Sequence, residues 1–117
     1  MRLLLFIFIG LLIPIGPAQD TRAAVVETIQ AGDFAPGQLE AHYLKHGVQL
    51  GYNNQEQYLQ GARTLLNASV GKDVLEKIRP NGDVEHYRVS SGEFAVMTKS
   101  GRIRTYFKTD YFYWIRQ

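Results

Sequence analysis

The 117-residue chain has 13 lysine and arginine residues against 11 acidic ones, and it has no cysteine. This length allows one small domain. The lack of cysteine excludes disulfide bonds, thiolate metal ligands and cysteine nucleophiles. The charge is unevenly distributed, because residues 94–117 hold five basic residues and one acid, Asp110. Such a basic segment favours an anionic partner, although it is also typical of a solvated face.

The first 18 residues have the layout of a secretory signal peptide. Arg2 precedes an apolar run from Leu3 to Ile15, and the small residues Gly16 and Ala18 have the spacing of a cleavage site. A transmembrane anchor is the alternative, but the run is shorter than the roughly 20 residues that span a bilayer. We predict a signal peptide at residues 1–18, a lead-in at 19–35, a folded domain at 36–117, and a secreted or periplasmic protein.

Two helices are predicted in the first half of the domain. One lies in "DFAPGQLEAHYLKHG", because a first helical turn tolerates Pro36 and Gly47 has the position of a C-cap glycine. The second follows Asn54, a good N-cap with Gln57 three residues later, and repeats apolar residues at helical spacing up to Leu66. Gly61 is its one interior weakness, at a cost of about 1 kcal/mol relative to alanine.

After Val70 the pattern becomes alternating. Four strands are predicted in "KDVLEKIR", "VEHYRV", "EFAVMT" and "RIRTYFK", separated by the hairpin-like loops "PNGD", "SSG" and "KSG". The tail "YFYWIRQ" is predicted to add a last strand or to pack back on the sheet. The chain is therefore expected to be α+β, with N-terminal helices packed on a four-stranded, or slightly larger, antiparallel meander.

Strict alternation in the last full strand predicts a cationic face. It places Arg102, Arg104, Tyr106 and Lys108 on one side and Ile103, Thr105 and Phe107 on the other. A solvent face over a core face explains this pattern. A curved sheet, or a strand that ends at a cleft, would instead allow Arg104 and Thr105 to reach one substrate.

Two of the three histidines, His42 and His46, have the i, i+4 spacing of a zinc pair, and His86 is a candidate third ligand. However, the general-base glutamate of a metalloprotease helix is missing, and Lys45 would place a cation beside the metal. The other chemistry is metal-free cleavage of RNA, in which the 2′-hydroxyl is the nucleophile. It needs a base, an acid and a cation, and histidine and arginine suit these functions. An ordinary exposed helix face remains the third interpretation.

The segments "HYLKHGVQLGYNNQEQYLQGARTLL" and "LEKIRPNGDVEHYRVSSGEFAVMTKSGRIRTYFK" resemble the bacterial and phage toxin nucleases of the barnase–EndoU–colicin–RelE (BECR) superfamily. The resemblance extends from about Leu39 to Lys108. It rests on H-x-x-K-H-G in a helix, a Gly-Glu-Phe-Ala-Val strand and a closing Gly-Arg-Ile-Arg-Thr-Tyr-Phe strand.

The resemblance implies a metal-independent endoribonuclease of toxin type, without a cofactor, that an immunity protein blocks. It places His42 as the principal catalytic base or acid, with His46 or Lys45 as its partner or a phosphate contact. Arg104 would act at the transition state, and Thr105 would bind a phosphate oxygen. Lys45, Tyr106 and Lys108 would bind substrate phosphate. A monomer is expected. The alternative is a non-enzymatic periplasmic binding module that uses the basic strand to contact an acidic partner.

Overall fold

The computed structural model describes residues 29–117, so the predicted signal peptide and most of the lead-in lie outside the described residues. The elements follow one another in the order α3 (Gln38–His42), η2 (Tyr43–Gly47, a π-helical segment), α4 (Gln55–Leu66), β2 (Val74–Ile78), β3 (Val84–Arg88), β4 (Glu93–Met97), β5 (Ile103–Lys108) and α5 (Tyr111–Ile115).

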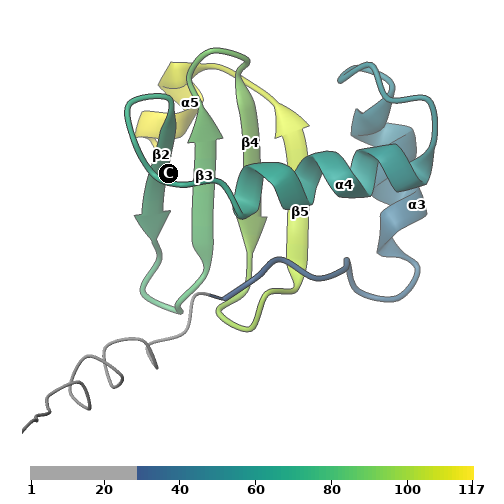
Figure 1. Ribbon diagram of the computed structural model, residues 1–117, viewed down its shortest axis with the longest axis horizontal. Helices are drawn as coiled ribbons and strands as arrows, with labels where there is room; N and C mark the ends of the chain where they lie inside the picture. Colours follow the sequence, from purple (N-terminus) through teal and green to yellow (C-terminus); the bar gives the residue numbers. More distant parts are fainter. Residues whose placement is uncertain (1–28) are drawn as a thin grey trace, which may run out of the picture.

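The four strands form one antiparallel sheet in the order β2-β3-β4-β5 (Figure 1). Each strand pairs with the next one along the chain, as short hairpin loops require. In the β2–β3 loop Gly82, which follows Asn81, has φ 92°, a conformation that favours glycine. The predicted α+β fold, helices followed by a four-stranded meander, is confirmed.

Helix α4 runs across one face of the sheet (Figure 1). Asn54 caps it as predicted, because its side chain accepts a hydrogen bond from the Gln57 backbone N–H at 2.8 Å. The buried side of the helix packs on one face of β3, β4 and β5. This main core consists chiefly of Phe34, Tyr58, Leu59, Ala62, Leu65, Leu66, Val74, Ala95, Met97, Ile103 and Tyr106.

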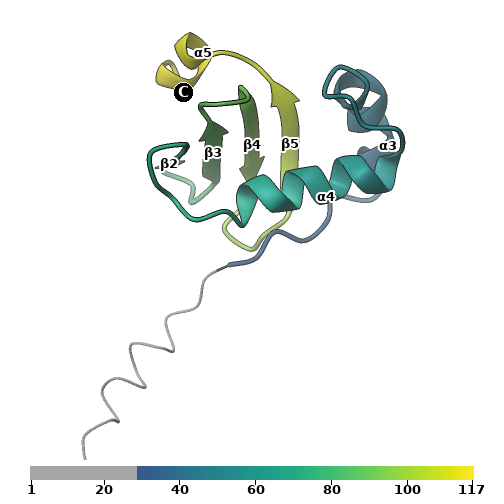
Figure 2. The same ribbon diagram turned by 45° about the horizontal axis from the view of Figure 1, so that its top comes forward.

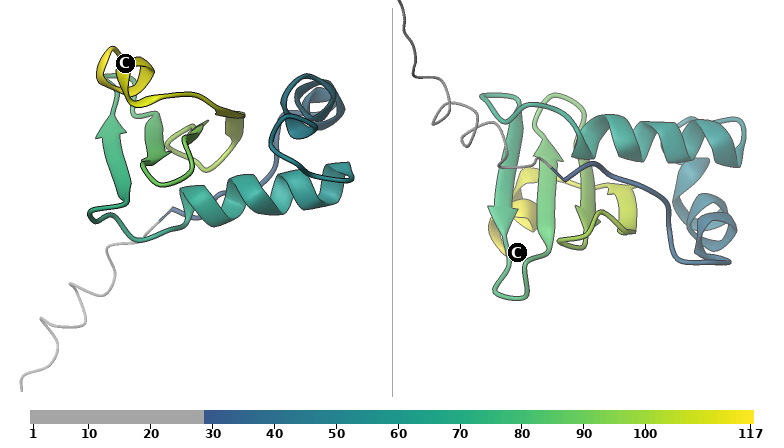
Figure 3. Two further views of the ribbon diagram at one scale, coloured as in Figure 1. Left: turned by 90° about the horizontal axis from the view of Figure 1, so that it is seen from above. Right: turned by 60° about the horizontal axis from the view of Figure 1, so that its bottom comes forward.

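The aromatic tail forms α5, which packs back on the opposite face of the sheet (Figure 3). Trp114 is 4% exposed and stacks on Tyr87, with ring centroids 5.8 Å apart and planes 14° from parallel. Phe94 and Val96 complete this second, smaller core. Of the two alternatives for the tail, packing back on the sheet is therefore the observed one.

Residues 29–35, the described part of the lead-in, contact the sheet. Phe34 forms an isolated parallel bridge with Ile103, and the Gly32 backbone N–H donates to the Gly101 carbonyl at 2.8 Å. The Ala31 N–H donates to the side chain of Asn67 at the end of α4. Backbone contacts thus fix the segment that leads into α3.

Helix α3 and η2 lie beside β5, the strand farthest from β2 (Figure 2). The helix begins at Gln38, after a turn in which Gly37 has φ 79°, and Pro36 precedes it. Gly47 does not end the helix as a left-handed cap, because the chain stays helical from Tyr43 through Gly47 in a π-type turn. Between residues 29 and 117, no helix combines the length and apolar character needed to cross a membrane.

Candidate functional site

Tyr43 and Gly47 set the direction in which the histidine helix faces. A Cβ atom on Gly47 would lie 2.2 Å from a ring carbon of Tyr43, so only glycine allows the tyrosine ring to lie there. The Tyr43 hydroxyl donates to the Tyr52 carbonyl, and its ring packs edge-on against Tyr58 at 5.9 Å. This inward tyrosine directs neighbouring positions of the helix away from the main core. A π-turn of this kind is frequent at functional sites.

His42 and His46 lie next to each other, with ring centroids 6.0 Å apart. The His42 ring packs against Phe34 at 5.0 Å, and the His46 ring packs against Phe107 of β5 at 5.2 Å. Each imidazole is partly buried. Aromatic contacts from two different segments therefore hold the pair against the sheet.

The surroundings of both histidines favour the neutral imidazole. Burial lowers the pKa of His42, and the nearby Lys45 charge lowers it further. Burial also lowers the pKa of His46, with added repulsion from His42 and Lys45. The Nδ1 atom of His42 is enclosed and has no hydrogen-bond partner among the described residues. A neutral imidazole is the form that can accept a proton as a general base.

Arg104 lies across a small hollow from His42. The hollow has a volume of about 200 Å³ and is lined by Ala35, Gln38, His42, Arg102, Ile103 and Arg104. The helix motif and the strand motif, more than fifty residues apart in the sequence, thus border one space. This juxtaposition is what the acid–base hypothesis requires.

A β-bulge at Arg104 corrects the predicted division of the strand into two faces. Thr105 pairs with Val96 and Ile103 pairs with Met97, so Arg104 is an extra residue between two consecutive pairs. A bulge interrupts strict alternation. As a result, Ile103 and Tyr106 both face α4, whereas Thr105 and Phe107 face the side of α5.

The bulge brings some predicted residues together and separates others. Thr105 is partly exposed. It lies on the same face of β5 as Phe107, the residue whose ring packs against His46. Tyr106 is fully buried on the α4 face, where its hydroxyl donates to Glu93 and accepts from the Tyr52 hydroxyl at 2.8 Å. Burial, followed by the bonds to Glu93 and Tyr52, raises the Tyr106 pKa.

Lys108 lies on the same side of β5 as Tyr106, at the end of the strand, and is exposed. The exposed Lys45 lines a second hollow together with His42. The structure therefore brings His42, His46, Lys45 and Arg104 to one region. Thr105 follows Arg104 in the strand but lines neither hollow, and Tyr106 and Lys108 lie on the other face of the strand.

Asp83 holds Arg104 in place. The Arg104 Nε donates to Asp83 Oδ2 at 2.8 Å; the carboxylate is only 4% exposed, whereas the Arg104 side chain is 51% exposed. A guanidinium has five N–H donors. Asp83 therefore orients the group through Nε and leaves the other N–H donors for a ligand.

Arg79 and Glu85 extend this ionic cluster. Arg79 lies 3.6 Å from Asp83 and pairs with Glu85, which is 1% exposed. Glu85, Val96 and Thr105 form one cross-strand row, and Oε1 of Glu85 has no partner among the described residues. Sequence analysis missed Arg79, Asp83 and Glu85, because a charged residue in a strand or loop is usually exposed. The one indication of burial in the sequence is that Glu85 lies two residues before Tyr87, an aromatic residue, and therefore on the same face of the strand.

His86 does not join the other two histidines. It is buried on the α4 face, where Nδ1 contacts the Leu65 carbonyl and Nε2 contacts Glu76, both at 2.8 Å. Over residues 29–117, no three side chains of the metal-binding types come together. The three-histidine zinc alternative therefore has no geometric support.

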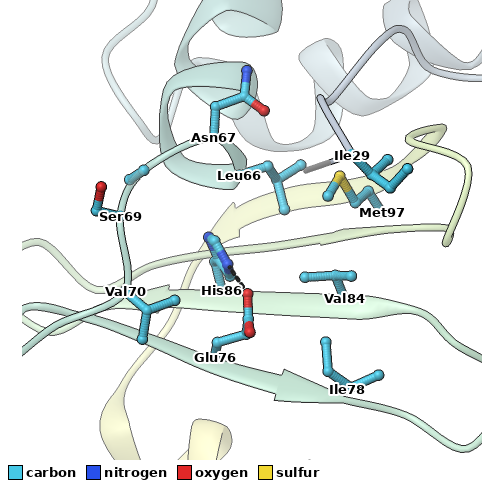
Figure 4. Close-up of a pocket in the computed structure, with 11 residues that line it drawn as sticks. Ile29, Leu66, Asn67, Ser69, Val70, Glu76, Ile78, Val84, His86 and Met97 are labelled. Atoms are coloured by element: carbon cyan, nitrogen blue, oxygen red, sulfur yellow. Dashed lines mark hydrogen bonds and ion pairs between the residues drawn. The ribbon is translucent and has the colours of Figure 1, made fainter. Parts of the chain in front are cut away.

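A hollow of about 600 Å³, larger than the one beside Arg104, lies next to this histidine (Figure 4). Its walls are mostly aliphatic, from the end of α4 and from β2 to β4, and the His86–Glu76 pair lies between them. None of the residues predicted to act on phosphate lines it.

A scan against protein-family models finds no match for this chain, and no curated protein is found to be similar to it.

Proposed function

We propose that this chain is a metal-independent endoribonuclease of toxin type, related to the BECR nucleases. One observation supports this most: the imidazole of His42, with that of His46 beside it, borders the same hollow as the guanidinium of Arg104. A neutral base, a second titratable group and a cation are the parts that phosphodiester cleavage by a 2′-hydroxyl needs.

The reaction is a transesterification at phosphorus. One histidine removes the 2′-hydroxyl proton, and the 2′-oxygen forms a bond to phosphorus. The bond from phosphorus to the 5′-oxygen breaks, and the protonated partner histidine donates its proton to that oxygen. The products are a 2′,3′-cyclic phosphate and a 5′-hydroxyl. No metal is required for any step.

Arg104 stabilises the phosphorane in this scheme. Charge builds up on the non-bridging oxygens in the transition state, and a fixed guanidinium stabilises it more than the ground state. Thr105 donates a hydrogen bond to one of these oxygens. Asp83 has a positioning function, because it fixes the Arg104 side chain through Nε.

The same proposal includes export of the chain and a protein inhibitor. Residues 1–18 direct secretion, which separates a ribonuclease from the RNA of the cell that makes it. The exposed cations Lys45, Arg102 and Arg104 border the site, so an immunity protein that blocks it presents an acidic surface.

The experiment is RNA cleavage in excess EDTA by the mature chain and by His42→Ala and His46→Ala variants. We expect cleavage by the parent and a loss of at least a hundredfold in each variant, because general acid–base catalysis contributes about 10² to 10⁴. Lys72→Ala, an exposed cation before β2, is the matched control and retains activity. Circular dichroism establishes that the variants are folded.

Each alternative gives a different result. Cleavage that EDTA abolishes indicates a metal enzyme. Absence of cleavage on every RNA, together with binding to an acidic protein, indicates the non-enzymatic module. Equal cleavage by the parent and both histidine variants contradicts the assigned site.

A further inference from the structure

Two hollows, not one, border His42. The first is the hollow of about 200 Å³ that contains Arg104; the second, about 220 Å³, is lined by Gln38, Ala41, His42 and Lys45. Gln38 and His42 line both. The two hollows are therefore neighbours on the surface, with these two side chains between them.

Helical spacing explains the second hollow. Its lining residues follow one another at i, i+3, i+4 and i+7, which is one face of the helix formed by α3 and η2. Ala41 ends at Cβ and leaves space between Gln38, His42 and Lys45. Ala35 has the same effect in the first hollow.

The charges of the two hollows are alike in sign. Arg102 and Arg104 line the first, Lys45 lines the second, and no carboxylate lines either. Lysine and arginine donors beside an uncharged amide suit a phosphate oxygen. Each hollow is thus suited to an anionic group, and a nucleic acid strand presents such groups at a regular interval.

The scissile phosphate fits the first hollow better. Two guanidinium groups border it, and His46 packs toward β5 through Phe107, so both imidazoles lie near that strand. The second hollow offers a single ammonium group, a point charge without bidentate geometry.

We propose, on the basis of the proposed function, that an RNA strand crosses both hollows. The scissile phosphate lies between His42 and Arg104, and an adjacent phosphate lies against Lys45. Gln38, which lines both hollows, contacts the nucleotide between the two phosphates. The preferred substrate therefore has at least two consecutive phosphodiesters, and Lys45 acts as a binding residue for the flanking phosphate.

The test compares kcat/KM for a dinucleotide with one phosphodiester and a trinucleotide with two, each assayed at the pH optimum of the variant. We expect the parent to prefer the trinucleotide by about tenfold, the effect of one charge-assisted contact. In Lys45→Ala this preference falls toward one. Lys72→Ala keeps it. A parent that does not prefer the trinucleotide, or a Lys45→Ala variant that still does, overturns the inference.

A binding measurement separates this inference from the proposed function. If the parent cuts no RNA of any length, the nuclease proposal fails. Whether or not the short substrates are cut, the affinity for 2′-O-methyl oligonucleotides decides about the two hollows. About tenfold weaker binding of the two-phosphate ligand by Lys45→Ala, with little change for the one-phosphate ligand, supports the path. Equal binding of the two-phosphate ligand by parent and variant overturns it.

Discussion

Burial and the charge of Lys45 both lower the pKa of the two histidines that we propose to be catalytic, His42 and His46. Burial is the larger cause for each ring, and for His46 the charge of His42 lowers the pKa as well. The rings are 6.0 Å apart, and in the proposed mechanism one of them accepts a proton while the other donates one. The form of the enzyme with one proton on the pair is the active form in the proposed mechanism.

The pH dependence of cleavage follows from these directions. When both values lie below the ordinary histidine pKa of about 6.5, the form with one proton is most populated below that pH. We expect a bell-shaped profile of kcat/KM with its maximum on the acid side of 6.5. Lys45→Gln removes the positive neighbour, so protonation becomes easier and the maximum moves to higher pH. The measurement is kcat/KM on RNA between pH 4 and pH 9, and an unchanged or opposite shift would contradict the explanation.

Gly61 has a packing function that propensity alone does not reveal. Helix propensity marks it as a weakness of α4, yet a Cβ atom there would lie 2.0 Å from the Tyr52 hydroxyl. That hydroxyl is bonded to the Tyr106 hydroxyl, which in turn is bonded to Glu93. Glycine at this position thus leaves room for a partly buried hydrogen-bonded chain that runs from Tyr52, before α4, through Tyr106 to Glu93 on the sheet.

We therefore expect Gly61→Ala to destabilise the protein although alanine is the better helix former. Displacement of the Tyr52 ring is an overpacking effect, which typically costs about 1 to 3 kcal/mol. Urea denaturation followed by circular dichroism measures the change. Gly71→Ala is the control, because nothing lies within 4 Å of its Cβ position. If Gly61→Ala is as stable as the parent, the packing explanation is wrong.

At the scale of elements, the sequence predicted the fold better than the site. Turn residues such as Asn81–Gly82, together with alternation, were enough to predict four strands and their order. The bulge at Arg104 cannot be recognised from the local sequence, because it depends on how β5 pairs with β4. Strict alternation therefore assigns Arg104 and Tyr106 to the same face, which is wrong.

The π-turn and the ionic cluster needed long-range information. The position of Gly47 at the end of a helical segment predicts a cap, whereas its close contact with the Tyr43 ring arises only in the π-turn. Asp83 and Glu85 pair with Arg79 of the same hairpin, but Asp83 also pairs with Arg104 of β5, which is distant in the sequence. Residue spacing predicts which side chains share a helix face, but it does not reveal such partners.

At the scale of the whole domain, the two cores lie on opposite faces of one sheet, so the same strands contribute to both. Adjacent residues of β4 belong to different cores: Ala95 packs under α4, and Phe94 and Val96 pack against the α5 side. Loss of one core therefore removes half of the packing of the same strands. The domain is expected to unfold in a single cooperative step.

The sole tryptophan makes this testable, because Trp114 reports on the α5 core. We expect the fluorescence of Trp114 and the far-ultraviolet circular dichroism to change at the same urea concentration. A fluorescence transition at distinctly lower urea would show instead that α5 and its core separate before the main domain unfolds.

The identity of the attacking group tests the central proposal most directly. The measurement is cleavage, in EDTA, of an RNA oligonucleotide and of a matched oligonucleotide that is 2′-deoxy at every position. The proposal predicts that the RNA is cut to fragments that end in a 2′,3′-cyclic phosphate and that the deoxy strand stays intact. Cleavage of both strands, or RNA fragments without a cyclic phosphate, would contradict a mechanism in which the 2′-hydroxyl attacks between His42 and Arg104.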